Sequence, residues 1–341
     1  MNVTIGTPPQ SFYFILSLVA RDVFVISTRL KDRKFRARKH YDSSLSSTYI
    51  PNSTHLNATF ILAKAGGPVA IDSMKIGPIV IPSQQFIETD FLQGSGFYLD
   101  GISYDGMIGL GSDAGMPASG NKNIVLDMWE RGLIGRPIFE LTLARHLQDA
   151  EMHDYGELVL GGSEVNENLK MIPFLNRKMP DHWSWGWIGY SVEANSVSVG
   201  DNSSIKVTMK NGMAQIETEL ILVLIPTKIS EYMDALMDVK EAPFDDIYSY
   251  VDCKKRNDLP DLVFNLGGIE VRLSPWAYMA ESREGGTGWA SCISLLGNSF
   301  DDNAIALGNG FLRGVRMVVD VEKNALGCKW LKPFNNICTK C

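Results

Sequence analysis

The segment GTPPQSFYFILSLVARDVFVIST, Gly6 to Thr28, decides how this sequence is interpreted. Its two apolar runs are rich in aromatic and β-branched residues and flank a short break, a pattern that predicts two buried strands joined by a loop. Ser17 ends the first run, and Arg21 and Asp22 lie just beyond it. Loops at the ends of buried strands often carry chemistry, so the sequence first raises the question of what this loop does.

A related pattern in the second half of the chain indicates an internal repeat. Ser17 is followed downstream by the strand-like run MIGLG, in which Gly109 lies 92 residues after Ser17. Glu217 ends the apolar stretch MAQI and is followed by IALGNG, in which Gly308 lies 91 residues after Glu217. This near-equal spacing favours two related lobes joined near residues 173 to 190.

Composition and patterning predict a large, mainly β protein. The chain has 341 residues, of which 45% are hydrophobic and 21% charged, and this length suits two domains or lobes. Its net charge of −7 disfavours a general nucleic-acid partner, and no apolar run approaches the roughly 20 residues of a membrane helix. Short runs rich in Val, Ile and Phe predict strands, whereas helical spacing appears only over Asn123–Ile134 and Lys228–Val239.

Two features favour a secreted or secretory-lumen location. The first residues, MNVTIGTPPQ, lack the basic head and apolar stretch of a signal peptide, so either the chain is cytoplasmic or its leader has been removed. The clustering of cysteines near the end of the chain and four acceptor sequons favour the second alternative. The sequons predict glycosylation at Asn2, Asn52, Asn57 and Asn202.

Five cysteines occur, an odd number that leaves one thiol unpaired or paired between chains. Three of them, Cys328, Cys338 and Cys341, predict a disulfide-tied tail in which Cys328 pairs with one of the other two. The alternative, a metal site at Cys338 and Cys341, needs two further ligands, and the tail offers only Cys328 and no histidine. No metal or other cofactor is therefore predicted.

Six segments in register carry a family resemblance. They are IGTPPQSF, YDGMIGLG, MWERGLI, GELVLGG, LPDLVF and LGNGFLRGVRMVVDVEKNALG, and they extend in order to Gly327. Together they resemble the pepsin family of aspartic peptidases, which implies two β-rich lobes around a long cleft. The resemblance implies an N-terminal lobe over 1–175, a C-terminal lobe over 176–327 and a tail over 328–341. It also implies a truncated first strand, an absent propeptide and a disulfide between Cys253 and Cys292.

In this family, two aspartates in Asp-Thr/Ser-Gly loops share one proton because like charges so close cannot both ionise. The ionised aspartate activates a water molecule, and the protonated one hydrogen-bonds to the substrate carbonyl. The resemblance places the two loops of this chain at Ser17-Leu18-Val19 and at Glu217-Thr218-Glu219.

Neither loop has the catalytic pattern. Ser17 has no carboxylate, and a hydroxyl without a partner base is not basic near neutral pH. Leu18 and Val19 replace the cross-lobe hydroxyl and the glycine. Glu217 keeps a carboxylate one methylene further out, an error on the order of 1 Å that can cost about 100-fold. Glu219 adds a second negative charge in place of glycine.

The flap and a neighbouring strand also differ from the family pattern. Thr59-Phe60 matches the family's Thr-Tyr without the phenol hydroxyl, and Asn309 stands where the family commonly has Asp. We therefore expect a catalytically inactive homologue that binds a peptide or protein, as a decoy or an inhibitor-like protein. The alternatives are an aspartic endopeptidase with residual acid proteolysis and a decaying gene without a function.

Three further features have competing interpretations. The run LKDRKFRARKH holds six Lys or Arg between Lys31 and Lys39, which fits either an anionic partner, such as a sulfated glycan or acidic lipid, or a solvated surface loop. Tryptophans near the lobe junction fit a binding platform or, more commonly, packing. These are Trp183, Trp185 and Trp187, and in the tail Trp330 and Phe334 are expected to pack on the body.

Overall fold

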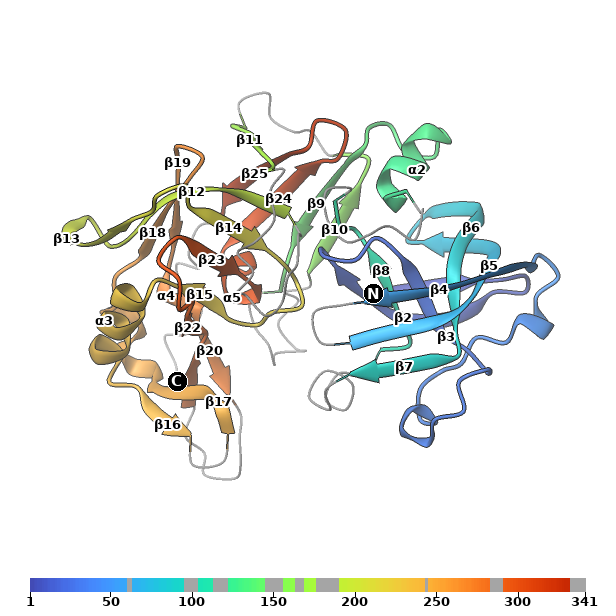
Figure 1. Cartoon of the computed structure of the whole chain (residues 1–341), viewed down its shortest axis with the longest axis horizontal. Helices are drawn as coiled ribbons and strands as arrows, with labels where there is room; N and C mark the ends of the chain where they lie inside the picture. Colours follow the sequence, from blue (N-terminus) through green and yellow to red (C-terminus); the bar gives the residue numbers. More distant parts are fainter. Residues whose placement is uncertain are drawn as a thin grey trace. The chain divides into compact units, whose positions relative to one another are not determined.

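A computed structural model of the chain describes residues 1–59, 63–94, 104–112, 122–144, 156–162, 169–175, 190–242, 245–282 and 291–331. It is mainly β, as the sequence predicts, and divides into two compact units (Figure 1). The first contains Met1–Pro137, and the second contains Ile138–Pro180 and the chain from Tyr190 onward. Among the described helices, none is long and apolar enough to cross a membrane.

The first unit is built on one twisted sheet with the strand order β1-β2-β8-β3-β6-β5-β4, and β7 pairs with β5. Phe24, Ile26 and Met107 are buried in a cluster beneath the sheet, and Phe12 and Phe14 point inward from alternate positions of β2. The elements are β1 (Asn2–Ile5), β2 (Gln10–Ser17), β3 (Val23–Ile26), η1 (Arg33–Phe35), η2 (Ser43–Leu45), β4 (Ile50–Thr59), β5 (Ala63–Ile76), β6 (Ile79–Thr89), β7 (Phe91–Gly94), β8 (Gly106–Gly109) and α2 (Ile124–Glu130).

The second unit contains three sheets among its described residues. Their strand orders are β10-β9-β24-β25-β11, β19-β18-β12-β14-β23-β15-β22 with β13 paired to β12, and β16-β17-β21-β20. The elements are β9 (Ile138–Thr142), β10 (Glu157–Leu160), β11 (Ile172–Pro173), β12 (Tyr190–Val199), β13 (Asn202–Thr208), β14 (Met213–Ile216), β15 (Val223–Ile225), α3 (Thr227–Met237), β16 (Lys240–Ala242), β17 (Asp245–Asp252), η3 (Cys253–Asn257), β18 (Leu262–Leu266), β19 (Ile269–Leu273), α4 (Pro275–Tyr278), β20 (Met279–Ser282), β21 (Ser291–Ser294), β22 (Leu296–Asn298), β23 (Ala304–Leu307), α5 (Asn309–Leu312), β24 (Val315–Asp320) and β25 (Ala325–Trp330).

The division between the units differs from the boundary predicted at residue 175. Strands β9 and β10 precede that boundary, yet β9 pairs along β24 from Ile138↔Asp320 to Leu141↔Met317. The chain therefore joins the second unit directly after Pro137, because its next two strands extend a sheet whose other strands come from the end of the sequence.

The two predicted helices are present, and local chemistry sets their ends. Asn123 caps α2 because its side chain accepts a hydrogen bond from the Val125 N–H, and Gly132 beyond the helix has a φ of +70°. Asp238 ends α3 in the left-handed conformation, with φ of +54°. Ile229 and Met233 bury one face of α3.

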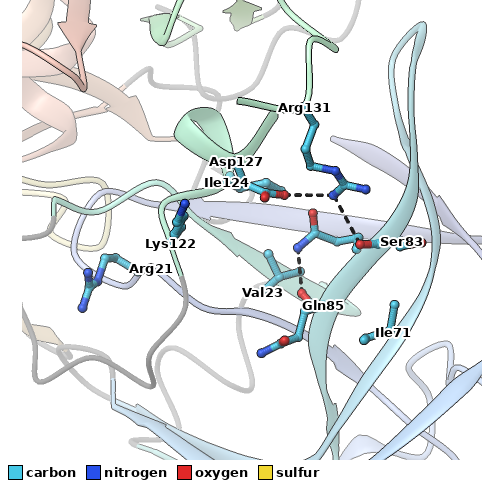
Figure 2. Close-up of a pocket in the computed structure, with 10 residues that line it drawn as sticks. Arg21, Val23, Ile71, Ser83, Gln85, Lys122, Ile124, Asp127 and Arg131 are labelled. Atoms are coloured by element: carbon cyan, nitrogen blue, oxygen red, sulfur yellow. Dashed lines mark hydrogen bonds and ion pairs between the residues drawn. The ribbon is translucent and has the colours of Figure 1, made fainter. Parts of the chain in front are cut away.

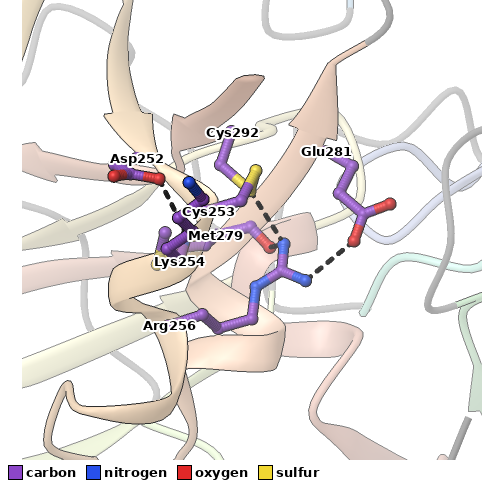
Figure 3. Close-up of a disulfide and its surroundings, with 7 residues drawn as sticks. All are labelled: Asp252, Cys253, Lys254, Arg256, Met279, Glu281 and Cys292. Atoms are coloured by element: carbon purple, nitrogen blue, oxygen red, sulfur yellow. Dashed lines mark hydrogen bonds and ion pairs between the residues drawn. A yellow bond between two sulfur atoms is a disulfide. The ribbon is translucent and has the colours of Figure 1, made fainter. Parts of the chain in front are cut away.

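Cys253 and Cys292 form the disulfide that the resemblance implies (Figure 3). Arg256, which is almost fully buried, holds this region together. Its guanidinium donates to Glu281 at 2.9 Å and to the Cys292 sulfur at 3.1 Å, and it stacks on the Trp276 ring at 4.5 Å.

Within the described part of the chain the thiol of Cys328 is free, and its bridge to the tail stays a prediction. Cys328 lies inside β25 opposite Met317, so its backbone is fixed within the sheet. Its expected partners Cys338 and Cys341 lie outside the described residues, as do Phe334 and the tryptophans Trp183, Trp185 and Trp187.

Candidate active-site loops

The loop after Ser17 crosses the end of a central strand. Strand β2 runs parallel to β8, with Ser17 opposite Gly109, and β3 returns antiparallel on the other side of β8, with Val23 opposite Ile108. The backbone N–H of Gly109 donates to the Asp22 carbonyl at 3.0 Å, which ties the loop to the strand that it crosses. The chain therefore leaves the sheet at Ser17 and re-enters it on the far side of β8.

The second unit repeats this topology with Glu217 in the place of Ser17. Strand β14 runs parallel to β23, with Ile216 opposite Leu307, and β15 returns antiparallel, with Val223 opposite Leu307. The Glu217 N–H donates to the Leu307 carbonyl at 3.3 Å. Glu217 therefore lies beside the Leu307–Gly308 peptide, as Ser17 lies opposite Gly109 in the first unit.

A glycine at the end of each central strand, Gly109 in β8 and Gly308 directly after β23, allows the loop to pass close above it. A Cβ built on Gly109 would lie 2.5 Å from the Ala20 carbonyl oxygen, and one on Gly308 would lie 2.3 Å from the Leu220 carbonyl oxygen. No side chain fits at such distances, because the obstructing atoms are backbone. The sequence spacing that pairs Ser17 with Gly109 and Glu217 with Gly308 thus reflects one structural device that occurs once in each unit.

The family follows from these repeated loops and from the comparison with known proteins. A family model described as eukaryotic aspartyl protease matches residues 1–329. The chain belongs to this family. It is 29% identical over 335 residues to vacuolar protease A of Aspergillus fumigatus, covering 96% of this chain and 77% of that protein. It is 28% identical over 333 residues to the vacuolar aspartic protease of Candida albicans (96% and 73%), and 24% identical over 332 residues to gastricsin of Cavia porcellus (96% and 78%).

Ser17 holds its own loop in shape. Its side chain is fully buried, and its hydroxyl oxygen accepts hydrogen bonds from the backbone N–H groups of Val19 at 3.2 Å and Ala20 at 2.9 Å. Both donors would otherwise be buried N–H groups that need another acceptor. The Ser17 hydroxyl therefore acts like the cap of a helix, as a local acceptor that fixes a turn.

Glu217 has a different electrostatic environment. Its side chain is 2% exposed, and its pKa is raised well above the ordinary 4.5, first by burial and second by the negative charge of Glu219. The nearby amide of Gln215 donates to Glu217 Oε2 at 3.5 Å, a long and therefore weak contact. This environment favours the neutral, protonated carboxyl, which can donate a hydrogen bond but is a poor base.

The remaining loop residues pack as apolar or partly buried side chains. Leu18 and Val19 are fully buried, Thr218 is half-buried and Glu219 is almost buried. Neither Val19 nor Glu219 adopts a left-handed φ, so neither position requires glycine for its backbone conformation in this chain. The burial of Leu18 and Val19 indicates that both side chains contribute to packing.

A polar pocket of about 370 Å³ lies beside the Ser17 loop and was not predicted from the sequence (Figure 2). Arg21 and Lys122 line one part of it, and Arg131 lines another, where its guanidinium donates to Asp127 at 2.9 Å and to the Ser83 carbonyl at 3.3 Å. Lys122 in turn pairs with Glu130. Because these charged groups bind one another and come from segments far apart in sequence, the pocket has no local signature and we assign it no ligand.

The other predicted site residues lie on the surface or outside the described chain. Thr59 ends β4, and its flap partner Phe60 is outside the described residues. Among the sequon asparagines, Asn2 and Asn57 are exposed, Asn52 is half-buried and Asn202 begins β13. Exposure leaves Asn2 and Asn57 accessible to a modifying enzyme.

Proposed function

We propose that this chain is a non-catalytic member of the eukaryotic aspartyl protease family that binds a peptide or protein segment without cleaving it. The observation that carries the proposal is the shared register of the two loops, which gives Ser17 and Glu217 the same position in their units. At that position one unit has no carboxylate, and the other has a buried carboxyl whose pKa is raised by burial and by the charge of Glu219.

Binding does not require the catalytic pair. An extended peptide is held mainly by main-chain hydrogen bonds and side-chain pockets, and neither depends on two aspartates. A chain that keeps the family fold and loses the acid–base pair therefore retains the means to bind and to sequester a ligand, as a decoy or an inhibitor-like protein does.

The alternative function is acid endopeptidase activity, which the retained Glu217 carboxyl favours. The deciding experiment incubates the protein with a pool of extended synthetic peptides from about pH 2 to pH 7, with and without a pepstatin-like inhibitor. We expect peptides to be retained intact, as detected by mass spectrometry of the bound fraction. Inhibitor-sensitive cleavage that disappears in Glu217→Gln would overturn the non-catalytic proposal.

We further propose that the protein reaches the secretory lumen and is glycosylated, on the grounds of its sequons and its disulfide. Expression in a secreting eukaryotic cell, followed by enzymatic removal of N-glycans, should lower the apparent mass. Asn57→Gln should remove one step of that shift, whereas Asn265→Gln, outside any sequon, should leave it unchanged.

A further inference from the structure

The segment Leu30–His40, here called the basic loop, concentrates positive charge on an acidic protein. It contains six Lys or Arg and a single carboxylate, Asp32, which gives it a net charge of +5. The whole chain has a net charge of −7, so −12 falls on the remaining residues. Charge this unevenly distributed attracts an anionic partner to one face in particular.

The basic loop is anchored to the body of the first unit. Leu30 and Phe35 are buried, and the two ring nitrogens of His40 lie 2.9 Å from the Ser27 carbonyl oxygen and 3.0 Å from the Phe35 carbonyl oxygen. Asp32 caps η1 by accepting a hydrogen bond from the Lys34 N–H. A partner that binds here meets a loop whose backbone is already ordered, which lowers the entropic cost of association.

The cations divide into two groups. Arg38 and Lys39 serve the fold, because Arg38 lies over the Tyr104 ring at 5.6 Å and the Lys39 ammonium donates to the Ser11 carbonyl. The other four, Lys31, Arg33, Lys34 and Arg36, are exposed, and none of them forms an ion pair with a carboxylate of the described residues. The Lys31 ammonium donates locally, to the Thr28 carbonyl at 2.8 Å.

From this arrangement we propose that the basic loop is a docking surface for a linear sulfated polysaccharide. Guanidinium groups bind sulfate oxygens with paired hydrogen bonds, and four exposed cations on one short loop match a chain of closely spaced anions. An anionic membrane is the less suitable partner, because stable attachment to lipid also needs apolar side chains, and Leu30 and Phe35 face the core. The basic loop shares no residue with the loops at Ser17 and Glu217, so this proposal does not rest on the proposed function.

Heparin is the probe that tests the proposal. The experiment measures the dissociation constant of the full chain for labelled heparin at about 50 mM and about 500 mM salt. The test variant combines Lys31→Gln, Arg33→Gln, Lys34→Gln and Arg36→Gln. A control variant, which removes the same number of charges from exposed positions of the second unit, combines Lys206→Gln, Lys210→Gln, Lys228→Gln and Lys254→Gln.

We expect binding that weakens steeply with salt, a dissociation constant raised about tenfold or more in the test variant, and a change below about twofold in the control. Both variants should unfold at the wild-type temperature, which separates loss of charge from loss of fold. Equal weakening in the two variants would overturn the proposal, because net charge alone would then explain the binding. It would also be overturned by no binding of wild type to heparin, or by tighter binding to phosphatidylserine vesicles than to heparin.

Discussion

The loops at Ser17 and Glu217 have the same strand topology but carry different functional groups, a hydroxyl in one and a carboxyl in the other. Each leaves a strand, crosses a central glycine and returns antiparallel on the other side. In the first loop the Ser17 hydroxyl accepts hydrogen bonds from two backbone N–H groups of the same turn. In the second loop the buried carboxyl of Glu217 lies beside a second acid, Glu219. The two loops therefore share one backbone arrangement although their side chains differ, because that arrangement depends on glycine and on register.

The largest effect, a loss of stability, is expected at the glycine that each of the two loops crosses. Gly109→Ala and Gly308→Ala should each destabilise the protein by about 4 kcal/mol or more, because each new Cβ would meet a backbone carbonyl oxygen at 2.5 Å or closer. Thermal unfolding and secreted yield measure this loss. Gly135→Ala is the matched control, since no atom lies within 4 Å of its Cβ position. If Gly109→Ala or Gly308→Ala unfolded at the wild-type temperature, the loop in that unit would not cross its strand as closely as described.

The next effect tests whether the two loops differ only in their side chains. Restoring the family pattern with Ser17→Asp, Leu18→Thr and Val19→Gly in one unit, and Glu217→Asp with Glu219→Gly in the other, should create inhibitor-sensitive hydrolysis at acid pH. We expect a rate about 100-fold above that of wild type, because a shared proton needs both carboxylates in place.

Restoring one unit alone is the control and should give no more than the wild-type rate, because a single aspartate has no partner with which to share the proton. The prediction would be contradicted if a variant restored in one unit alone hydrolysed peptide as fast as the variant restored in both units. It would also fail if the full variant folded with a wild-type unfolding temperature and remained inactive, since another feature would then block catalysis.

Local pattern predicted what is local in this fold. The strands on both sides of Ser17, the helices α2 and α3, and the repeated loop-to-glycine spacing follow from periodicity and glycine positions. The division after Pro137 differs from the predicted boundary at residue 175 because β9 pairs with β24, nearly 180 residues later, and periodicity does not specify a distant partner. The pocket near Arg21 and the capping role of the Ser17 hydroxyl could not be predicted for the same reason, because both depend on three-dimensional contacts that periodicity does not specify.

A smaller effect separates the structural role of Ser17 from a catalytic one. Ser17→Ala should destabilise the protein by about 1–3 kcal/mol, because the N–H groups of Val19 and Ala20 lose a buried acceptor. Urea unfolding measures this difference. Ser44→Ala is the control: Ser44 is exposed and its hydroxyl donates to Asp42, so the change should alter stability by less than about 0.5 kcal/mol. Equal stability of Ser17→Ala and wild type would show that the turn does not need its hydroxyl.

The smallest effect concerns the second loop and has a defined dependence on pH. Folding raises the pKa of Glu217 above 4.5, so below that value the folded and unfolded chains both hold the proton and no stability is lost. As pH rises above it, the unfolded chain releases the proton while the folded chain retains it, and stability falls. Glu217→Gln, which cannot ionise, should therefore raise the unfolding temperature at pH 7 and change it little at pH 4.

The exposed Glu322 provides the matched control, because Glu322→Gln should leave the unfolding temperature unchanged at both pH values. Glu219→Gln should give an effect of the same sign as Glu217→Gln but smaller, since the charge of Glu219 is the second cause of the raised pKa and burial is the first. If Glu217→Gln instead lowered the unfolding temperature more at pH 7 than at pH 4, the Glu217 carboxylate would be ionised and stabilised in the fold. The second loop would then retain the charged form that a general base requires, and residual acid proteolysis would become the better account of this chain.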